Sequence, residues 1–161
     1  MTIKRKLIHG TIAAASTIFI LGGSPAFAED NPRVAAEIMA LARSQWAAEI
    51  ADQPAAQQLS AVADDYTEFN PEYPTRIDGR SMALKMAEVK PDVRSVYGDM
   101  QNPKVQVYGD TAILTYNYAG LTRDKDGKIR PQTAKSTRVY VRQGGKWMLV
   151  HANFAPVRAP D

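Results

Sequence analysis

The sequence contains no cysteine and only two histidines, His9 and His151. Without cysteine the chain can form no disulfide, no thiolate nucleophile and no zinc–thiolate site, and it has no residue to carry a lipoprotein anchor. His9 lies in a segment that we expect to be removed, so His151 would be the only histidine of the mature protein. Two histidines are therefore not available within one subunit for a metal site or a catalytic pair, and we expect neither metal nor cofactor.

A long apolar stretch occurs only at the N-terminus, in a pattern typical of a signal peptide. Lys4-Arg5-Lys6 is a basic start, Leu7 to Gly23 is mostly apolar, and Ala26-Phe27-Ala28 is an A-x-A cleavage site. The apolar run is short for a membrane span and no stop-transfer pattern follows it, although an uncleaved anchor helix is the alternative. We predict cleavage after Ala28, a periplasmic or secreted protein, and no membrane attachment after cleavage.

The predicted mature chain also has no excess of positive or negative charge. The formal net charge of +3 comes from 20 Lys+Arg against 17 Asp+Glu, and three of those basic residues, Lys4 to Lys6, belong to the signal peptide. The mature part thus carries 20 − 3 = 17 basic and 17 acidic residues, since residues 1–28 contain no acidic residue. We therefore expect no binding to nucleic acid or to a membrane surface.

Residues 29–161 are enough for a single domain, and residues 102–154 read as an antiparallel meander. Runs rich in β-branched and aromatic residues are bounded by Asp-Gly and Gly-Gly dipeptides, which are typical of hairpins. The expected strands cover residues 105–108, 112–118, 137–141 and 147–151, with turns at Gly109-Asp110, Asp124 to Gly127 and Gly144-Gly145.

The part upstream of the meander is expected to supply helices that cover the sheet. Apolar residues recur at helical spacing from Pro32 to Ala51, but Gln45 and Glu49 fall inside the apolar arc. Either the helix end frays and both side chains reach solvent, or a polar group points into a pocket.

Two shorter helices and two more strands complete the prediction. We expect a helix from Pro54 to Asp64, a short strand over 66–69, and a third helix after Asp78-Gly79-Arg80-Ser81 that ends at Pro91. A first long strand would then run from Val93 to Met100. The residues expected to be buried in the two helices are Leu59, Val62, Met82, Met86 and Val89. Helices segregated to one face of an antiparallel sheet define an α+β domain, with a pocket between the two layers.

Several motifs in this order resemble the association (hub) domain of calcium/calmodulin-dependent protein kinase II. They are residues 102–109 (NPKVQVYG), 126–130 (DGKIR), 136–140 (STRVY) and 145–151 (GKWMLVH). The wider similarity is to SnoaL-like domains of the NTF2-like superfamily, and this chain resembles an exported bacterial member. The resemblance implies a cone with a strongly curved antiparallel sheet and three N-terminal helices on its concave face. It also implies a pocket inside the cone and self-association, at least to a dimer, through the outer face.

The resemblance does not extend to kinase chemistry or to calmodulin. The sequence has no Gly-rich loop, no His-Arg-Asp loop and no Asp-Phe-Gly, and an exported bacterial protein would not meet calmodulin. Of the arginines in the family's pocket only Arg138 is matched, and Tyr118 and Phe154 stand where the other two would be. This departure from the family implies a more aromatic pocket with one fixed charge.

The candidate ligand-binding residues follow from this similarity and from strand alternation. Arg138 and Tyr140 share one face of their strand, which is either the solvent face or the inside of the cone. His151 would be a proton carrier or a hydrogen-bonded structural residue, with Asn153 on its face. Tyrosines could line the pocket or simply pack in the core. The full candidate set is Arg138, Tyr118, Tyr66, Tyr140, His151, Asn153 and Phe154.

The acidic residues give no catalytic or metal-binding pattern. Asp124 to Gly127 looks like part of a calcium loop, but the first and last ligand positions would fall on Thr122 and Thr133. We therefore predict a non-catalytic, oligomeric module that binds a small molecule or a protein partner in its cone. The alternative is a small SnoaL-like enzyme, an isomerase, dehydratase or hydrolase, that acts on an apolar metabolite.

Overall fold

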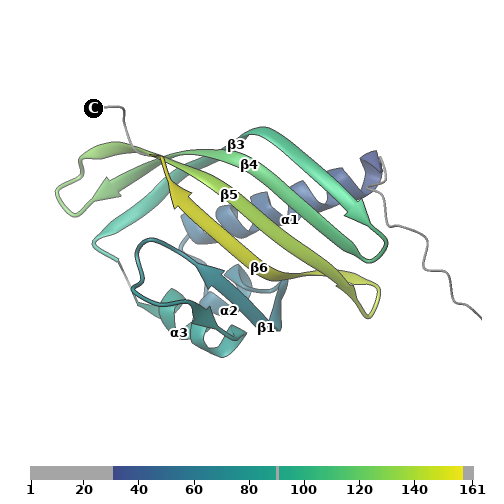
Figure 1. Cartoon of the computed structure of the whole chain (residues 1–161). Helices are drawn as coiled ribbons and strands as arrows, with labels where there is room; N and C mark the ends of the chain where they lie inside the picture. Colours follow the sequence, from purple (N-terminus) through teal and green to yellow (C-terminus); the bar gives the residue numbers. More distant parts are fainter. Residues whose placement is uncertain (1–30, 90, 158–161) are drawn as a thin grey trace, which may run out of the picture.

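The structure is a computed structural model that describes residues 31–89 and 91–157. The predicted signal peptide, residues 1–28, lies outside the described residues. The chain forms one six-stranded sheet in the order β2-β1-β6-β5-β4-β3, with its helices on one side (Figure 1). The elements are α1 (Pro32–Ile50), α2 (Ala55–Gln58), β1 (Val62–Phe69), β2 (Ile77–Asp78), α3 (Arg80–Glu88), β3 (Val93–Tyr108), β4 (Thr111–Asp124), β5 (Ile129–Gln143) and β6 (Lys146–Pro156). The prediction of an α+β, NTF2-like fold with a curved sheet is confirmed.

The meander β3 to β6 is antiparallel throughout, as predicted, but β1 pairs with β6 in parallel. The two segments expected as separate strands before and after residue 101 form one strand, β3. Its register shifts between Gln101 and Lys104, where Asn102 has a positive φ of 49°. This irregularity lets the strand bend without ending, which accounts for its length of 16 residues.

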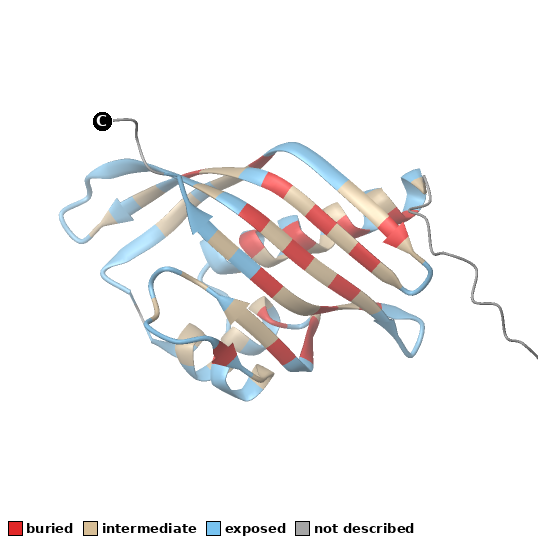
Figure 2. Ribbon diagram, viewed as in Figure 1, coloured by how far each residue is buried: buried red, intermediate tan, exposed pale blue. Residues whose placement is uncertain are grey.

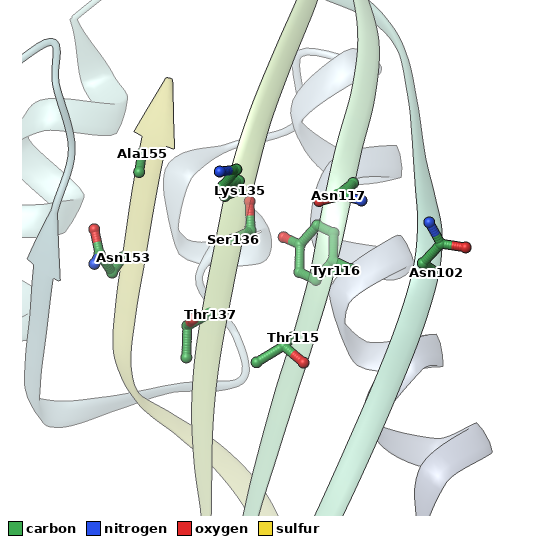
Figure 3. A pocket seen from close by; sticks show the side chains of 9 residues that line it. All are labelled: Asn102, Thr115, Tyr116, Asn117, Lys135, Ser136, Thr137, Asn153 and Ala155. Carbon is green, nitrogen blue, oxygen red and sulfur yellow. The ribbon is translucent and has the colours of Figure 1, made fainter. Parts of the chain in front are cut away.

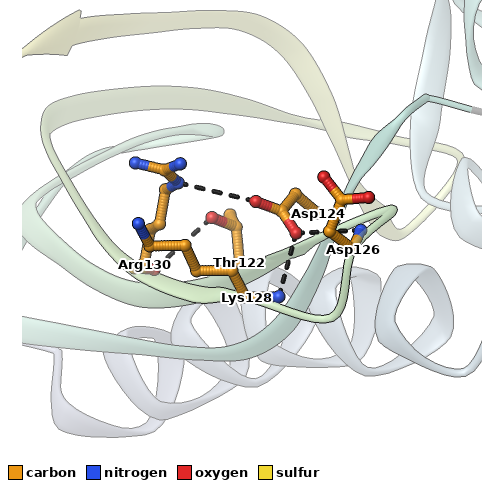
Figure 4. A network of polar contacts seen from close by, with 5 residues as sticks. All are labelled: Thr122, Asp124, Asp126, Lys128 and Arg130. Atoms are coloured by element: carbon orange, nitrogen blue, oxygen red, sulfur yellow. Dashed lines mark hydrogen bonds and ion pairs between the residues drawn. The ribbon is translucent and has the colours of Figure 1, made fainter.

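The turn at residues 124–127 is a hairpin, as its sequence predicts (Figure 4). One carboxylate oxygen of Asp124 accepts from the backbone N–H groups of Asp126 and Lys128, at 3.1 and 2.9 Å. The other oxygen lies 3.7 Å from the Arg130 guanidinium. The carboxylate therefore closes the turn itself.

The helix α1 covers the inner face of the sheet and begins where predicted. Its start is capped by Asn31, whose side chain accepts from the N–H of Val34 at 3.1 Å. Val34, Ile38, Ala42 and Trp46 form its buried stripe. The helix stays intact to Ile50, so the alternative in which its end frays is wrong. Of the two polar residues, Gln45 points inward and accepts a hydrogen bond from Arg138, whereas Glu49 is exposed.

The predicted second helix is wrong in length. Instead of running to Asp64, α2 ends at Gln58 and the chain enters β1 at Val62. Both Leu59 and Val62 are buried, as expected, but Val62 is in a strand that pairs with Leu149 of β6. Pairing with the sheet therefore outweighs the local helical tendency of residues 59–64.

The third helix also buries a different face from the one predicted. Met82 and Val89 are exposed, at 37% and 65%, while Ala83 is buried and Met86 packs partly against the core. The helix ends at Glu88, so Val89 is extended and lies beyond the packed surface.

The core lies between α1 and the inner face of β3 to β6. Buried and half-buried residues alternate along β4 and β5, which marks an inner and an outer face (Figure 2). Both tryptophans, Trp46 and Trp147, are buried. The helices lie behind the sheet in the view of Figure 1, and within residues 31–89 and 91–157 no helix covers the outer face.

Candidate functional site

The arginine on β5 is the centre of the inner face. Arg138 points inward and is 3% exposed, so the alternative of a solvent-facing side chain is wrong. Its Nε donates to the Tyr116 hydroxyl at 3.0 Å, and one Nη donates to Oε1 of Gln45 at 2.6 Å. Strand β4 thus positions one partner and helix α1 the other.

Two aromatic rings flank the guanidinium. Its central carbon lies 5.8 Å from the ring centroid of Trp46 and 5.3 Å from that of Phe154. A planar cation over aromatic faces is held electrostatically as well as by packing. The rings exclude water from the charge and keep its orientation.

This buried cation has no acidic partner close to it. Among the described residues no carboxylate oxygen lies within 4.0 Å of Arg138. The ion pairs found among them join Arg76 to Asp78, Arg94 to Asp52 and Arg130 to Asp124. Glu49 interacts with Arg138 at longer range. Glu49 is exposed as a whole residue, but desolvation of its carboxyl by neighbouring groups raises the pKa of that carboxyl, and the charge of Arg138 opposes the rise. A buried charge that is satisfied only by neutral partners is costly.

A second polar group lies on β1. The Tyr66 hydroxyl donates to one carboxylate oxygen of Glu68 at 2.6 Å, and the Asn70 amide donates to the other at 2.9 Å. Burial raises the pKa of the Tyr66 hydroxyl, and the neighbouring Glu68 carboxylate raises it further. Tyr66 therefore stays protonated and acts as a donor.

Tyr118 lies against the backbone of two strands. Gly98 and Gly120 face each other across β3 and β4, and a Cβ built on either would lie against the Tyr118 ring. The ring also meets Trp46 edge-on at a centroid distance of 5.4 Å. The two glycines leave the space that lets this tyrosine lie flat at the edge of the site.

The structure divides the predicted site residues between the two faces of the sheet. Five of them lie on the inner face: Arg138, Tyr118, Tyr66, Tyr140 and Phe154. The other two, His151 and Asn153, pair with Val139 and Thr137 and so share the outer face with them. Nδ1 of His151 lies 2.8 Å from the Thr67 hydroxyl, which gives it a structural hydrogen bond.

Sequence reasoning missed Ser136 and Tyr73 as site residues. Ser136 is 4% exposed, and its hydroxyl has no hydrogen-bond partner. Its position two residues before Arg138 was the available signal, because alternation places both side chains on one face. Tyr73, in the loop after β1, packs against the core and has no comparable periodicity to reveal it.

Two shallow hollows of about 340 Å³ lie near the site. One is on the outer face around the β3 irregularity (Figure 3), and its lining is largely polar: Asn102, Thr115, Tyr116, Asn117, Lys135, Ser136, Thr137, Asn153 and Ala155. The other lies between the β1–β2 loop and the end of β6, with Asn70, Tyr73 and Phe154 in its lining. Phe154 also lies against the Arg138 guanidinium, so this side chain borders both the second hollow and the buried arginine.

The described part of the chain was also searched for metal-binding clusters and for membrane-spanning helices. In residues 31–89 and 91–157, no three His, Asp or Glu side chains group so that they could hold a metal ion. No helix in the same residues is long and apolar enough to cross a membrane.

Comparison with known proteins gives a family and a set of similar folds. The family described as "Calcium/calmodulin dependent protein kinase II association domain" matches residues 34–157. The comparison with curated proteins found no match.

Solved structures agree in fold at low sequence identity. The hub homology domain of Chlamydomonas reinhardtii is 23% identical, covers 78% of this chain and 99% of its own, and gives a TM-score of 0.65. The association domain of the C. elegans kinase is 22% identical, with 74% and 93% covered and a TM-score of 0.62. An NTF2-like superfamily protein from Salmonella enterica is 15% identical, with 80% and 95% covered and a TM-score of 0.63.

Proposed function

Because this chain belongs to the calcium/calmodulin dependent protein kinase II association domain family, we propose that it is a self-associating, non-catalytic module that binds a small anionic molecule inside its cone. The observation that carries the proposal is the two-sided character of β5. This strand directs Val139 and Val141 to the outer face and the buried Arg138 to the inner face.

Self-association is supported by an apolar patch on the outer face, which we call the outer patch. Its members are half-buried and occupy paired positions on three adjacent strands: Ile113, Val139, Val141 and Met148. None of the helices in the described part of the chain lies over this face (Figure 1). A contiguous apolar surface on one side of a sheet is suited to an isologous contact with a second copy.

Binding of an anion is supported by the charge balance of the inner face. Arg138 is buried with neutral hydrogen-bond partners, and a guanidinium offers five N–H donors in a planar fork. The bonds to Tyr116 and Gln45 use two of these donors. A ligand carboxylate would provide the counter-charge that the described residues do not place within 4.0 Å.

The enzymatic alternative is not better supported. The carboxylates nearest the site are already engaged, since Glu68 accepts from Tyr66 and Asn70, and Glu49 lies 3.5 Å from the Ser95 hydroxyl. A general base needs a carboxylate beside a reacting group, and no such arrangement distinguishes itself here. We further propose export, based on the signal-peptide pattern of residues 1–28.

One experiment tests the assembly, the ligand and the export together. Native mass spectrometry of protein purified from the periplasm of an expressing bacterium should show a complex of two or more subunits, lacking residues 1–28, with a small molecule bound. Val139→Lys should lower the subunit number, whereas Val89→Lys, at an exposed valine outside the outer patch, should not. A ligand-free monomer at every protein concentration would refute the proposal.

A further inference from the structure

One row of outer-face residues runs across four strands and joins the two hollows. Thr115 of β4 pairs with Thr137 of β5, which pairs in turn with Asn153 of β6. Asn153 then pairs with Phe69 of β1. The hollow around the β3 irregularity, which we call the first hollow (Figure 3), is lined by the polar part of this row, and the second hollow by Asn153 and Phe69. Ala155 also lines both hollows, so they adjoin each other beside the end of β6.

The first hollow presents polar side chains that have no partner within the described protein. They are Asn102, Thr115, Asn117, Lys135, Thr137 and Asn153. Within residues 31–89 and 91–157, none of these side chains forms a hydrogen bond or an ion pair with another described group. Neighbouring strands lie about 4.8 Å apart, and same-face residues along a strand lie about 6.7 Å apart. The amides and hydroxyls therefore form a grid whose spacing is comparable to the width of a six-membered sugar ring.

The charge of the lining favours a hydroxylated and negatively charged ligand. Asparagine and threonine side chains both donate and accept hydrogen bonds, as sugar hydroxyls do. Lys135 supplies the charge of the first hollow and pairs with Asn117 on β4. No Asp or Glu of the described residues lines either hollow. An ammonium group among neutral donors attracts a carboxylate, and nothing in this lining attracts a cation.

The second hollow is more apolar than the first. Phe69 is 51% exposed, and Pro71 and Pro74 line the same hollow and restrict the conformation of its loop. Arg76 also lines it, but its Nε already lies 2.8 Å from Asp78. An exposed aromatic face at the end of a polar row is suited to the face of a sugar ring that carries C–H groups.

We propose that the two hollows together bind an acidic disaccharide, with a uronate ring over the polar row and its carboxylate at Lys135. The second sugar ring then lies against Phe69. This site is distinct from the anion site proposed at Arg138, because that side chain is buried on the opposite face of the sheet.

The outer patch borders the first hollow, but none of its members lines either hollow. Ile113 and Val139 form the next row along the strands after Thr115 and Thr137. A second copy seated on the outer patch would therefore adjoin the first hollow without replacing its polar residues. Saccharide binding and self-association are thus separable by substitution.

The probes are the disaccharides of galacturonate, glucuronate and mannuronate, each compared with its uncharged counterpart and with its own monomer. Binding to the full mature protein is measured by calorimetric titration at low ionic strength. At least one acidic disaccharide should bind about two- to fivefold more tightly than its uncharged counterpart, which is the range for an exposed ion pair. Added salt should reduce this difference.

Two substitutions with matched controls locate the ligand. Lys135→Gln should abolish the difference between the acidic and the uncharged disaccharide, whereas Lys146→Gln, at an exposed lysine that lines neither hollow, should preserve it. Phe69→Ala should weaken binding of both disaccharides but not of the monomer. Tyr97→Ala should change neither, because Tyr97 is equally exposed at 51% but lies outside both linings.

Three results would overturn the saccharide site. They are absence of binding by every disaccharide, equal affinity of acidic and uncharged forms for the unmodified protein, and an acid preference that survives Lys135→Gln. The last result would place the acid elsewhere and leave the anion site at Arg138 standing. Binding by the Val139→Lys variant alone would show that a second copy fills the first hollow, which would overturn this inference and support self-association.

Discussion

The hydrogen bond between Gln45 and Arg138 connects α1 to β5, and its removal should be costly. The bond is 2.6 Å long, and its donor is a charged group that is 3% exposed. Gln45→Leu leaves a buried N–H of the guanidinium without its acceptor. Since hydrogen bonds to charged groups contribute about 1.5–3 kcal/mol, we expect the free energy of unfolding to fall by about that amount.

The same substitution should be nearly harmless once the charge is gone. In an Arg138→Met background Gln45→Leu removes no bond and adds apolar surface beside Trp46, so its cost should be about 0 kcal/mol. The difference between the two backgrounds is the coupling energy of the pair. Gln57→Leu on α2 is the matched control, because Gln57 is exposed and the change should stay within about 0.5 kcal/mol.

Urea unfolding at one fixed protein concentration measures all four proteins and the control. The concentration must be fixed because assembly contributes to apparent stability. If Gln45→Leu costs less than about 0.5 kcal/mol in the unmodified protein, or costs the same in both backgrounds, the bond does not join helix to sheet as described.

Three further outcomes are expected. Gly120→Ala should destabilise by about 1–3 kcal/mol and shift the Tyr118 ring signals in NMR spectra, because the new methyl would come within 3.0 Å of that ring; an unchanged ring environment would contradict this. Thr67→Val keeps the shape of the side chain but removes the 2.8 Å contact to His151, and should cost about 0.5–1.5 kcal/mol in urea unfolding; no loss would show that the contact is not stabilising. The pKa of Glu49 is raised above 4.5 in the folded protein, so its contribution to stability is present below pH 4.5 and is lost as pH rises through the folded pKa. The midpoint temperature of thermal unfolding of the unmodified protein should therefore fall relative to that of Glu49→Gln as pH increases from 4 to 7. A difference between the two midpoints that does not change with pH would contradict the raised pKa of Glu49.

The meander was predictable because its signals are local. Gly109, Gly127 and Gly144-Gly145 all have positive φ, which glycine adopts without cost, and the strands between them are rich in β-branched residues. The inward direction of Arg138 also follows from alternation, once one neighbour is known to face the core. What alternation alone does not decide is which face is the core, because valine and arginine both occur at interfaces.

The errors arose where distant parts of the chain meet. Residues 59–64 have helical periodicity, but their partner in the structure is β6, some 85 positions later in the sequence. The sequence near Val62 contains no signal for this distant pairing. The unsatisfied hydroxyl of Ser136 is likewise invisible in the sequence. It depends on how Tyr116 and Phe154 pack beside it on two neighbouring strands.

The parallel pairing of β1 with β6 also constrains the order in which the protein can fold. The last strand of the chain lies in the interior of the sheet, between β1 and β5, and the bond from Thr67 to His151 closes a separation of 84 residues. Helix α1 and the hairpins of β3 to β5 can form from neighbouring residues, but β1 and β2 have no place in the sheet until β6 is present. Contacts of such long sequence separation slow folding, because the entropy of closing the loop is lost before the contacts form. The chain is therefore expected to remain incompletely folded, with the inner face of β5 open to water, until residues 146–156 are available.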